Sequence, residues 1–170
     1  MWPMIKQRRV FEQGHRRKFL VVLDDTPEVE SALFFAASRI GHTGGQIVLL
    51  YVIEPHDFTQ WAGVKDVQIE EETAKAKALF RLNRRRLDKV GFDQISTDEV
   101  IRSGKRPEAI LKLIEEDEDI AILILGASTD NRGPGPLVSS LAAGKLAGTF
   151  PIPIVIVPGN LSLDDLKAMA

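Results

Sequence analysis

Residues 19–27 read FLVVLDDTP, a run of five apolar residues that ends abruptly at two aspartates, a threonine and a proline. A short, continuous apolar run is typical of a parallel strand that is buried on both faces of a sheet. Thr26 is a suitable N-cap and Pro27 a suitable first residue for a helix, which we expect to end at Gly41. The stretch therefore predicts a strand followed by a helix, the first unit of an α/β domain.

The rest of the chain repeats this alternation of strand and helix. Apolar runs predict strands at 47–53, 120–125 and 154–157, and the weaker, polar run at 94–101 suits a strand at the sheet edge. We expect a long helix between residue 65 and Gly91, another from about Pro107, a fourth from Ser139 or Ser140 to Thr149, and loops at 54–65 and 127–138. This order predicts a parallel sheet with helices on both faces.

Composition limits the class of protein. The chain has 170 residues, of which 44% are hydrophobic and 27% charged, as expected for one globular domain. Cysteine is absent, which excludes disulfides, zinc–thiolate sites and thiol catalysis. No apolar run approaches the roughly 18 residues of a membrane span, and no signal peptide is evident. We expect a cytoplasmic protein without a membrane partner.

Charge is distributed unevenly, although the net charge is only −2 and gives no reason to expect nucleic acid as a partner. The first 18 residues contain six lysines and arginines and one glutamate. They are either a solvated tail or an arm that contacts nucleic acid or a protein partner. Residues 81–89 form a second basic cluster, expected on the wet face of the long helix, with acidic residues 70–72 complementing the helix dipole. We divide the chain into a basic extension (1–17), one domain (18–158) and a tail (159–170).

Familiar catalytic motifs are absent from the sequence. Residues 139–146 contain Gly-Lys but lack the first glycine and the final hydroxyl of a phosphate-binding loop. Residues 133–138 lack the third glycine of a dinucleotide fingerprint, and there is no G-x-S-x-G elbow. His15, His42 and His56 share no spacing that pairs them, so we expect them at the surface. With no obvious general base, a weak ATPase is the only enzymatic alternative.

A candidate site lies where the strands end. In parallel sheets, ligands bind beyond the carboxyl ends of strands at the point where strand order reverses. Asp24 and Asp25 follow the first strand, where they either contact a ligand or only cap a helix. Gly126 permits a close backbone approach, and hydroxyls and free amides at Ser139 and Ser140 would suit a phosphate at a helix N-terminus. The alternative is an ordinary loop with a serine cap.

Four segments resemble motifs of the universal stress protein family, in the family's order: VVLDDT at 21–26, RSGKRPEAI at 102–110, ILILG at 122–126 and FPIPIVIV at 150–157. The resemblance implies a Rossmann-like, open five-stranded sheet in the order 3-2-1-4-5 and a homodimer formed through the fifth strand. It also implies the nucleotide motif G-x2-G-x9-G-[S/T], which falls on Gly126, Thr129, Ser139 and Ser140. The second and third glycines of this motif are thus replaced by Thr129 and Ser139.

The resemblance further implies a stress-responsive regulatory protein that binds ATP or AMP, without a metal. The nucleoside would contact Asp24, beside Asp25 and Thr26, and the adenine would contact Val52 or Ile53. The phosphates would lie on the segment from Gly126 to Ser140, with Gly133 and Gly135 as an alternative cradle. The competing hypothesis is a nucleotide-free, dimeric interaction module, as in family members that lack the glycine motif.

Overall fold

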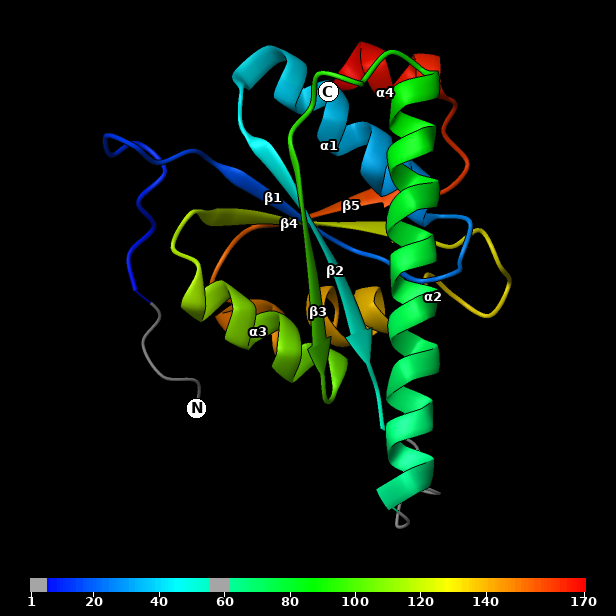
Figure 1. The fold of residues 1–170 in the computed structure, drawn as a ribbon. Coiled ribbons are helices and arrows are strands. Elements are labelled where there is room, and N and C mark those ends of the chain that lie inside the picture. The colour runs from blue at the N-terminus through cyan, green and yellow to red at the C-terminus, as the bar shows by residue number, and fades with distance from the viewer. Residues whose placement is uncertain (1–5, 56–61) are drawn as a thin grey trace.

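The computed structural model describes residues 6–55 and 62–170 of the chain. Five parallel strands form one twisted sheet in the order β3-β2-β1-β4-β5 (Figure 1), which confirms the predicted fold class and strand order. The strands are β1 (Lys18–Val22), β2 (Gln46–Ile53), β3 (Thr97–Ser103), β4 (Ile120–Ala127) and β5 (Ile154–Pro158).

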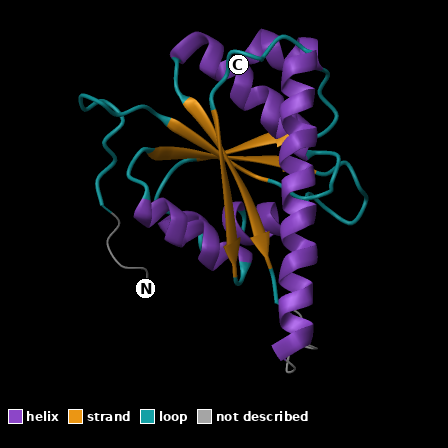
Figure 2. Ribbon diagram, in the orientation of Figure 1, coloured by secondary structure: helices purple, strands orange, loops and turns teal. Residues whose placement is uncertain are grey.

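Helices cover both faces of the sheet (Figure 2). They are α1 (Val29–Thr43), α2 (Ala62–Lys89), α3 (Arg106–Glu116) and α4 (Leu163–Met169). The buried residues of α1, α2 and α4 share one apolar core, and those of α3 share a second core on the opposite face. None of the helices in the described part of the chain has the length and apolarity that a membrane span needs.

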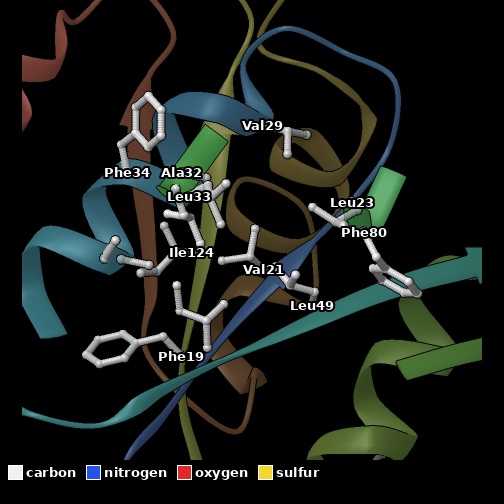
Figure 3. Close-up of a cluster of buried hydrophobic side chains, with 14 of the residues drawn as sticks. Phe19, Val21, Leu23, Val29, Ala32, Leu33, Phe34, Leu49, Phe80 and Ile124 are labelled. Carbon is white, nitrogen blue, oxygen red and sulfur yellow. The ribbon is translucent and has the colours of Figure 1, made fainter. Parts of the chain in front are cut away.

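Strand β1 contributes to both cores, which explains its unbroken apolar sequence. Phe19 and Val21 pack toward α1 (Figure 3), whereas Leu20 and Val22 pack toward α3, and all four side chains are at least 95% buried. Burying side chains of this size contributes roughly 1.5–3 kcal/mol each. Because β1 pairs with β2 on one side and β4 on the other, its C-terminal end lies at the centre of the carboxyl edge.

The start and end of α1 differ from the sequence prediction. Thr26 is not the N-cap, because its amide and its hydroxyl both donate to Asp24 Oδ1 in a local turn. The helix therefore begins two residues later than predicted. Glu28 is its N-cap residue and makes no side-chain cap bond. The helix continues past Gly41 and ends before Gly44, whose φ of 73° suits a residue without a β-carbon.

Two other predicted boundaries are wrong. Helix α2 begins at Ala62, inside the segment expected to be a loop. The predicted helix from Ser139 to Thr149 is instead a π-helical turn, η1 (Val138–Ala142), followed by a 3-10 turn, η2 (Ala147–Thr149). Gly144 and Gly148 account for the interruption, since glycine disfavours a helix by about 1 kcal/mol relative to alanine.

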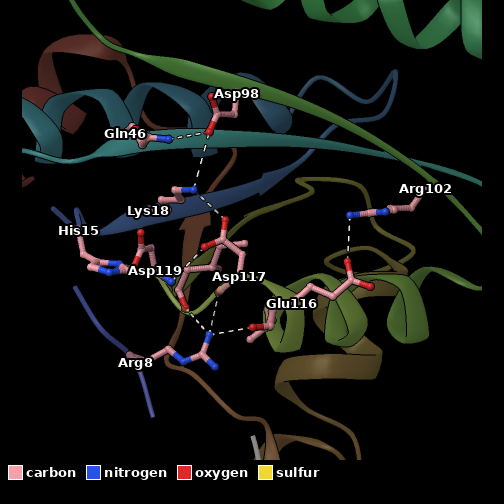
Figure 4. Close-up of polar contacts among 11 residues, drawn as sticks. Arg8, His15, Lys18, Gln46, Asp98, Arg102, Glu116, Asp117 and Asp119 are labelled. Atoms are coloured by element: carbon pink, nitrogen blue, oxygen red, sulfur yellow. Dashed lines mark hydrogen bonds and ion pairs between the residues drawn. The ribbon is translucent and has the colours of Figure 1, made fainter. Parts of the chain in front are cut away.

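The basic N-terminal segment is not simply a solvated tail. The Arg8 guanidinium donates to the carbonyl oxygens of Ile114, Asp117 and Ile120 at 2.8, 3.0 and 3.2 Å (Figure 4). It thereby satisfies the Ile114 carbonyl, which the last turn of α3 leaves unpaired, and ties this turn to the start of β4. Three more side chains of this segment make ion pairs with the residues after α3: Lys18 with Asp117, Arg9 with Glu118, and His15 with Asp119. The segment from Arg8 to Lys18 is therefore fastened to the amino edge of the sheet.

Candidate functional site

A small pocket lies at the carboxyl edge, between the ends of β1 and β4. Its lining includes four residues that the sequence analysis selected at this edge, Asp24, Thr26, Gly126 and Gly135, together with Arg106 and the rest of the segment 134–138. The space open to water is about 40 Å³, which is room for only a few water molecules. The strand ends thus converge as the sheet topology predicts, but the space between them is largely filled.

Arg106 supplies the positive charge of this pocket and was missed by the sequence analysis. It is the first residue of α3, and its Nε lies 3.2 Å from Glu54 Oε1, while its Nη1 lies 4.0 Å from Asp24 Oδ2. The sequence signal was an arginine directly before Pro107 at a predicted helix start. The pair of carboxylates balances the guanidinium, so Asp24 is already engaged by both Thr26 and Arg106.

The other predicted nucleoside and adenine contacts lie away from the pocket. Asp25 is exposed and its Oδ2 lies 3.5 Å from Lys75 Nζ, on the side of α2. Val52 and Ile53 are about 95% buried, with their side chains in the two opposite cores. The Ile53 carbonyl also accepts the Gly104 amide at 2.9 Å. None of these three residues lines the pocket.

Gly126 makes a close backbone contact, but with the protein itself. A β-carbon at Gly126 would lie 2.0 Å from the carbonyl oxygen of Glu28, and one at Gly159 would lie 3.2 Å from the Glu28 Cβ. The start of α1 is therefore pressed between two glycines. The glycine that the family motif would offer to a ligand accommodates Glu28 here.

The loop after β4 bonds half of its own backbone amides internally. Amides that would face an anion in a phosphate cradle donate instead within the loop, and Pro134 and Pro136 have no amide hydrogen. Five such bonds measure 2.9–3.1 Å: Ser128 N to Pro134 O, Asp130 N to Ser128 Oγ, Arg132 N to Asp130 Oδ1, Gly133 N to Asp130 O, and Ser139 N to Gly135 O. The amides of Thr129, Asn131, Gly135 and Leu137 make no such bond, so only part of the loop is closed to a phosphate.

A wider groove of about 420 Å³ lies on the outer side of this loop. It contains Gly133, Gly135 and Ser139, while Thr129 and Ser140 line neither this groove nor the pocket. Its charged side chains are Glu28, Asp130 and Arg132. Hydrogen bonds from Arg132 lower the pKa of Asp130, so this carboxylate stays ionised, and Arg132 itself is already paired with it. The groove is consequently unfavourable for a polyphosphate.

Ser139 and Ser140 do not form the predicted helix N-terminus. Both lie inside η1, one and two residues after its first residue, and no side-chain cap bond occurs at its N-cap, Leu137. A turn of five residues offers neither the free amides nor the dipole of a regular helix. The helix N-terminus that was expected at these serines is therefore not formed.

The remaining sequence candidates have structural roles. His15 is half-buried, with its Nδ1 2.6 Å from Asp119 Oδ1, whereas His42 is exposed at the end of α1. His56 lies outside the described residues. The Tyr51 hydroxyl donates to Glu72 Oε2 at 2.6 Å and holds α2 against β2, and burial followed by this bond raises the pKa of Tyr51. Within residues 6–55 and 62–170, no group of acidic and histidine side chains could hold a metal ion.

Comparison with known proteins agrees with the topology. The model of the universal stress protein family matches residues 15–158, most of the chain. This chain belongs to the universal stress protein family. No curated protein matches the sequence of this universal stress protein.

Solved universal stress proteins share the fold at low sequence identity. Universal stress protein UspA from Lactobacillus plantarum is 18% identical with a TM-score of 0.62, over 83% of this chain and 97% of that one. A universal stress protein from Archaeoglobus fulgidus in complex with dAMP is 18% identical, with a TM-score of 0.57 over 83% and 97%. A universal stress protein in complex with cAMP is 17% identical, with a TM-score of 0.57 over 83% and 96%.

The contact between Glu28 and Gly126 yields a stability prediction. Gly126→Ala forces the start of α1 away from β4, and overpacking of this kind should lower the free energy of unfolding by about 2–3 kcal/mol. At about 2–4 °C per kcal/mol, the melting temperature should fall by roughly 5–10 °C. Differential scanning calorimetry measures this change.

Gly41→Ala is the matched control, because it lies within α1 and its added β-carbon would meet no atom within 4 Å. Its unfolding free energy should stay constant or rise by up to about 1 kcal/mol. Equal stability of Gly126→Ala and the unmodified protein would contradict the close contact.

Proposed function

We propose that this universal stress protein is a non-enzymatic regulatory module of the stress response, which acts as a homodimer and does not hold a nucleoside triphosphate. The observation that carries the proposal is the contact at the start of the loop after β4, where Glu28 covers Gly126. The amides of Ser128, Arg132 and Gly133 in this loop are also bonded internally. Two carboxylates, Glu28 and Asp130, line the adjoining groove and would repel phosphates. Signal transfer through a protein surface needs no such ligand.

The two edges of the sheet support self-association through β5. Strand β3 carries charged residues at its edge, including Glu99, paired with Arg84 at 2.7 Å, and Arg102, paired with Glu116 at 3.0 Å. Charged side chains are a common protection of an edge against pairing. Strand β5 reads IVIVP without a charge, pairs only with β4, and leaves Ile156 44% exposed. The β5 edge is thus the unprotected one.

The central position of Ile156 in β5 gives a direct test of the dimer. If two β5 strands pair around a two-fold axis, Ile156 lies close to its own copy, and Ile156→Asp places two like charges opposite each other. At high ionic strength, where contacts between exposed charges are screened, we expect Ile156→Asp to be a monomer in size-exclusion chromatography with light scattering, and the unmodified chain to be a dimer. Met169→Asp, at another exposed apolar residue, should remain dimeric. A dimer that survives Ile156→Asp would contradict pairing through β5.

A second candidate function is binding of an adenosine monophosphate, and specific polar groups favour it. Asp24, Thr26 and Arg106 converge on the pocket between the strand ends. A carboxylate and a guanidinium are suited to a ribose hydroxyl and to a single phosphate. Solved relatives in complex with cAMP and dAMP share the fold. This ligand would require Glu28 and the segment 134–138 to move, because the present space is too small.

Thermal shift with ATP and AMP distinguishes these two functions. A ligand present at 100 times its dissociation constant stabilises a protein by about 2.7 kcal/mol, which is roughly 5–10 °C here. We expect no shift with ATP or AMP for the unmodified protein. A shift with AMP that Arg106→Gln abolishes would establish the second function instead. A shift with ATP would contradict the nucleotide-free module, and Glu28→Ala then tests whether that carboxylate limits access.

A further inference from the structure

The outer face of α2 carries charges that are separated by sign along the helix. We define this outer face as the exposed residues Asp66, Glu70, Ala74, Lys77, Ala78, Arg81, Arg85 and Lys89, which recur at intervals of three and four residues. Its first half is acidic, its centre has two alanines and Lys77, and its second half is basic except for Asp88, which is exposed about five turns after Glu70. Figure 1 shows that α2 lies along one side of the molecule, on the same face of the sheet as α1.

Contacts within the protein do not account for these charges. Other charges of α2 are held by the sheet and its loops: Glu72 by Tyr51, Lys75 by Asp25 and Arg84 by Glu99. By contrast, no ion pair within 4.0 Å joins Asp66, Glu70, Lys77, Arg81, Arg85 or Lys89 to another of the described residues.

The helix dipole does not account for the acidic half either. Because α2 begins at Ala62, its first turn contains no acidic residue, and Glu70 lies more than two turns inside the helix. Dipole effects fade within the first and last turns. The expectation that residues 70–72 compensate the dipole is therefore wrong, whereas Arg86 and Lys89 do lie in the last turn.

This arrangement is complementary to itself when inverted. If two α2 helices lie antiparallel with a two-fold axis between Lys77 and Ala78, residues at equal distances from the axis face each other. Glu70 of one copy then faces Arg85 of the other, and Asp66 faces Lys89. Because the two patches are identical and related by a two-fold axis, each of these residue pairs occurs twice in the contact. Near the axis, Lys77 and Arg81 of one copy face the small residues Ala78 and Ala74 of the other, which gives the two long side chains room.

We propose that the outer face of α2 is a second self-association surface, on which α2 of another copy packs antiparallel. A polyanion such as nucleic acid would meet Asp66 and Glu70 on the same face, so charge complementarity favours a second copy. Exposed ion pairs are individually weak and are screened by salt. The contact should therefore be reversible and salt-sensitive, and it would join β5-linked dimers into tetramers.

Sedimentation velocity of the full chain at low ionic strength tests this surface, separately from β5, in the Ile156→Asp background. We expect that background to form dimers through α2, and Arg85→Glu or Glu70→Arg to raise the dissociation constant by at least about tenfold, since each places like charges opposite each other. Lys112→Glu, an exposed charge reversal on α3, should have no effect. In the otherwise unmodified chain, Arg85→Glu should leave β5 dimers.

Mixing the two charge-reversed variants is the decisive step. A copy with Glu70→Arg and a copy with Arg85→Glu restore complementary pairs at both ends of the contact, so the mixture should associate although neither variant does alone. Failure of the mixture to associate would overturn the proposal, as would an Ile156→Asp protein that stays monomeric at low salt. Arg85-dependent binding of a single-stranded oligonucleotide, without heterodimers, would assign the surface to nucleic acid instead.

Discussion

The close contact between the Glu28 carbonyl and Gly126 determines how the carboxyl edge of this protein is used. A side chain at Gly126 would overlap the start of α1, so this position must be glycine for α1 to pack against β4. The same contact brings the Glu28 side chain toward Gly135. The contact between Glu28 and Gly126 therefore packs α1 against β4. It also places Glu28 in the space beyond the ends of β1 and β4.

The surroundings of this contact favour a protein–protein role over a nucleotide role. Half of the amides in the loop after β4 are bonded within the loop, and Arg106 is shared between Glu54 and Asp24. Apolar and charge-segregated surfaces lie elsewhere, on the β5 edge and on the outer face of α2. Because these surfaces lie on different parts of the fold, the two proposed contacts would form independently of each other.

The fold was predictable from the sequence because β1, β2 and β4 are buried on both faces and leave unbroken apolar runs. The site was predictable only in its location. Asp24, Thr26 and Gly126 line the pocket as topology requires, whereas Arg106 depended on side-chain packing across α3. The predicted helix from Ser139 failed because local serine capping was outweighed by Gly144, Gly148 and the bonds within the loop. Glu28 gave no signal, since its contact with Gly126 joins residues that are remote in sequence.

Amide hydrogen exchange of the loop after β4 tests the central claim most directly. The amides of Ser128, Arg132, Gly133 and Ser139 are bonded within the protein, so they should exchange slowly without ligand and at the same rate when AMP or ATP is added. Rapid exchange of these amides that becomes slow on adding a nucleotide would contradict the account, because it would show that the loop holds its donors free for phosphate.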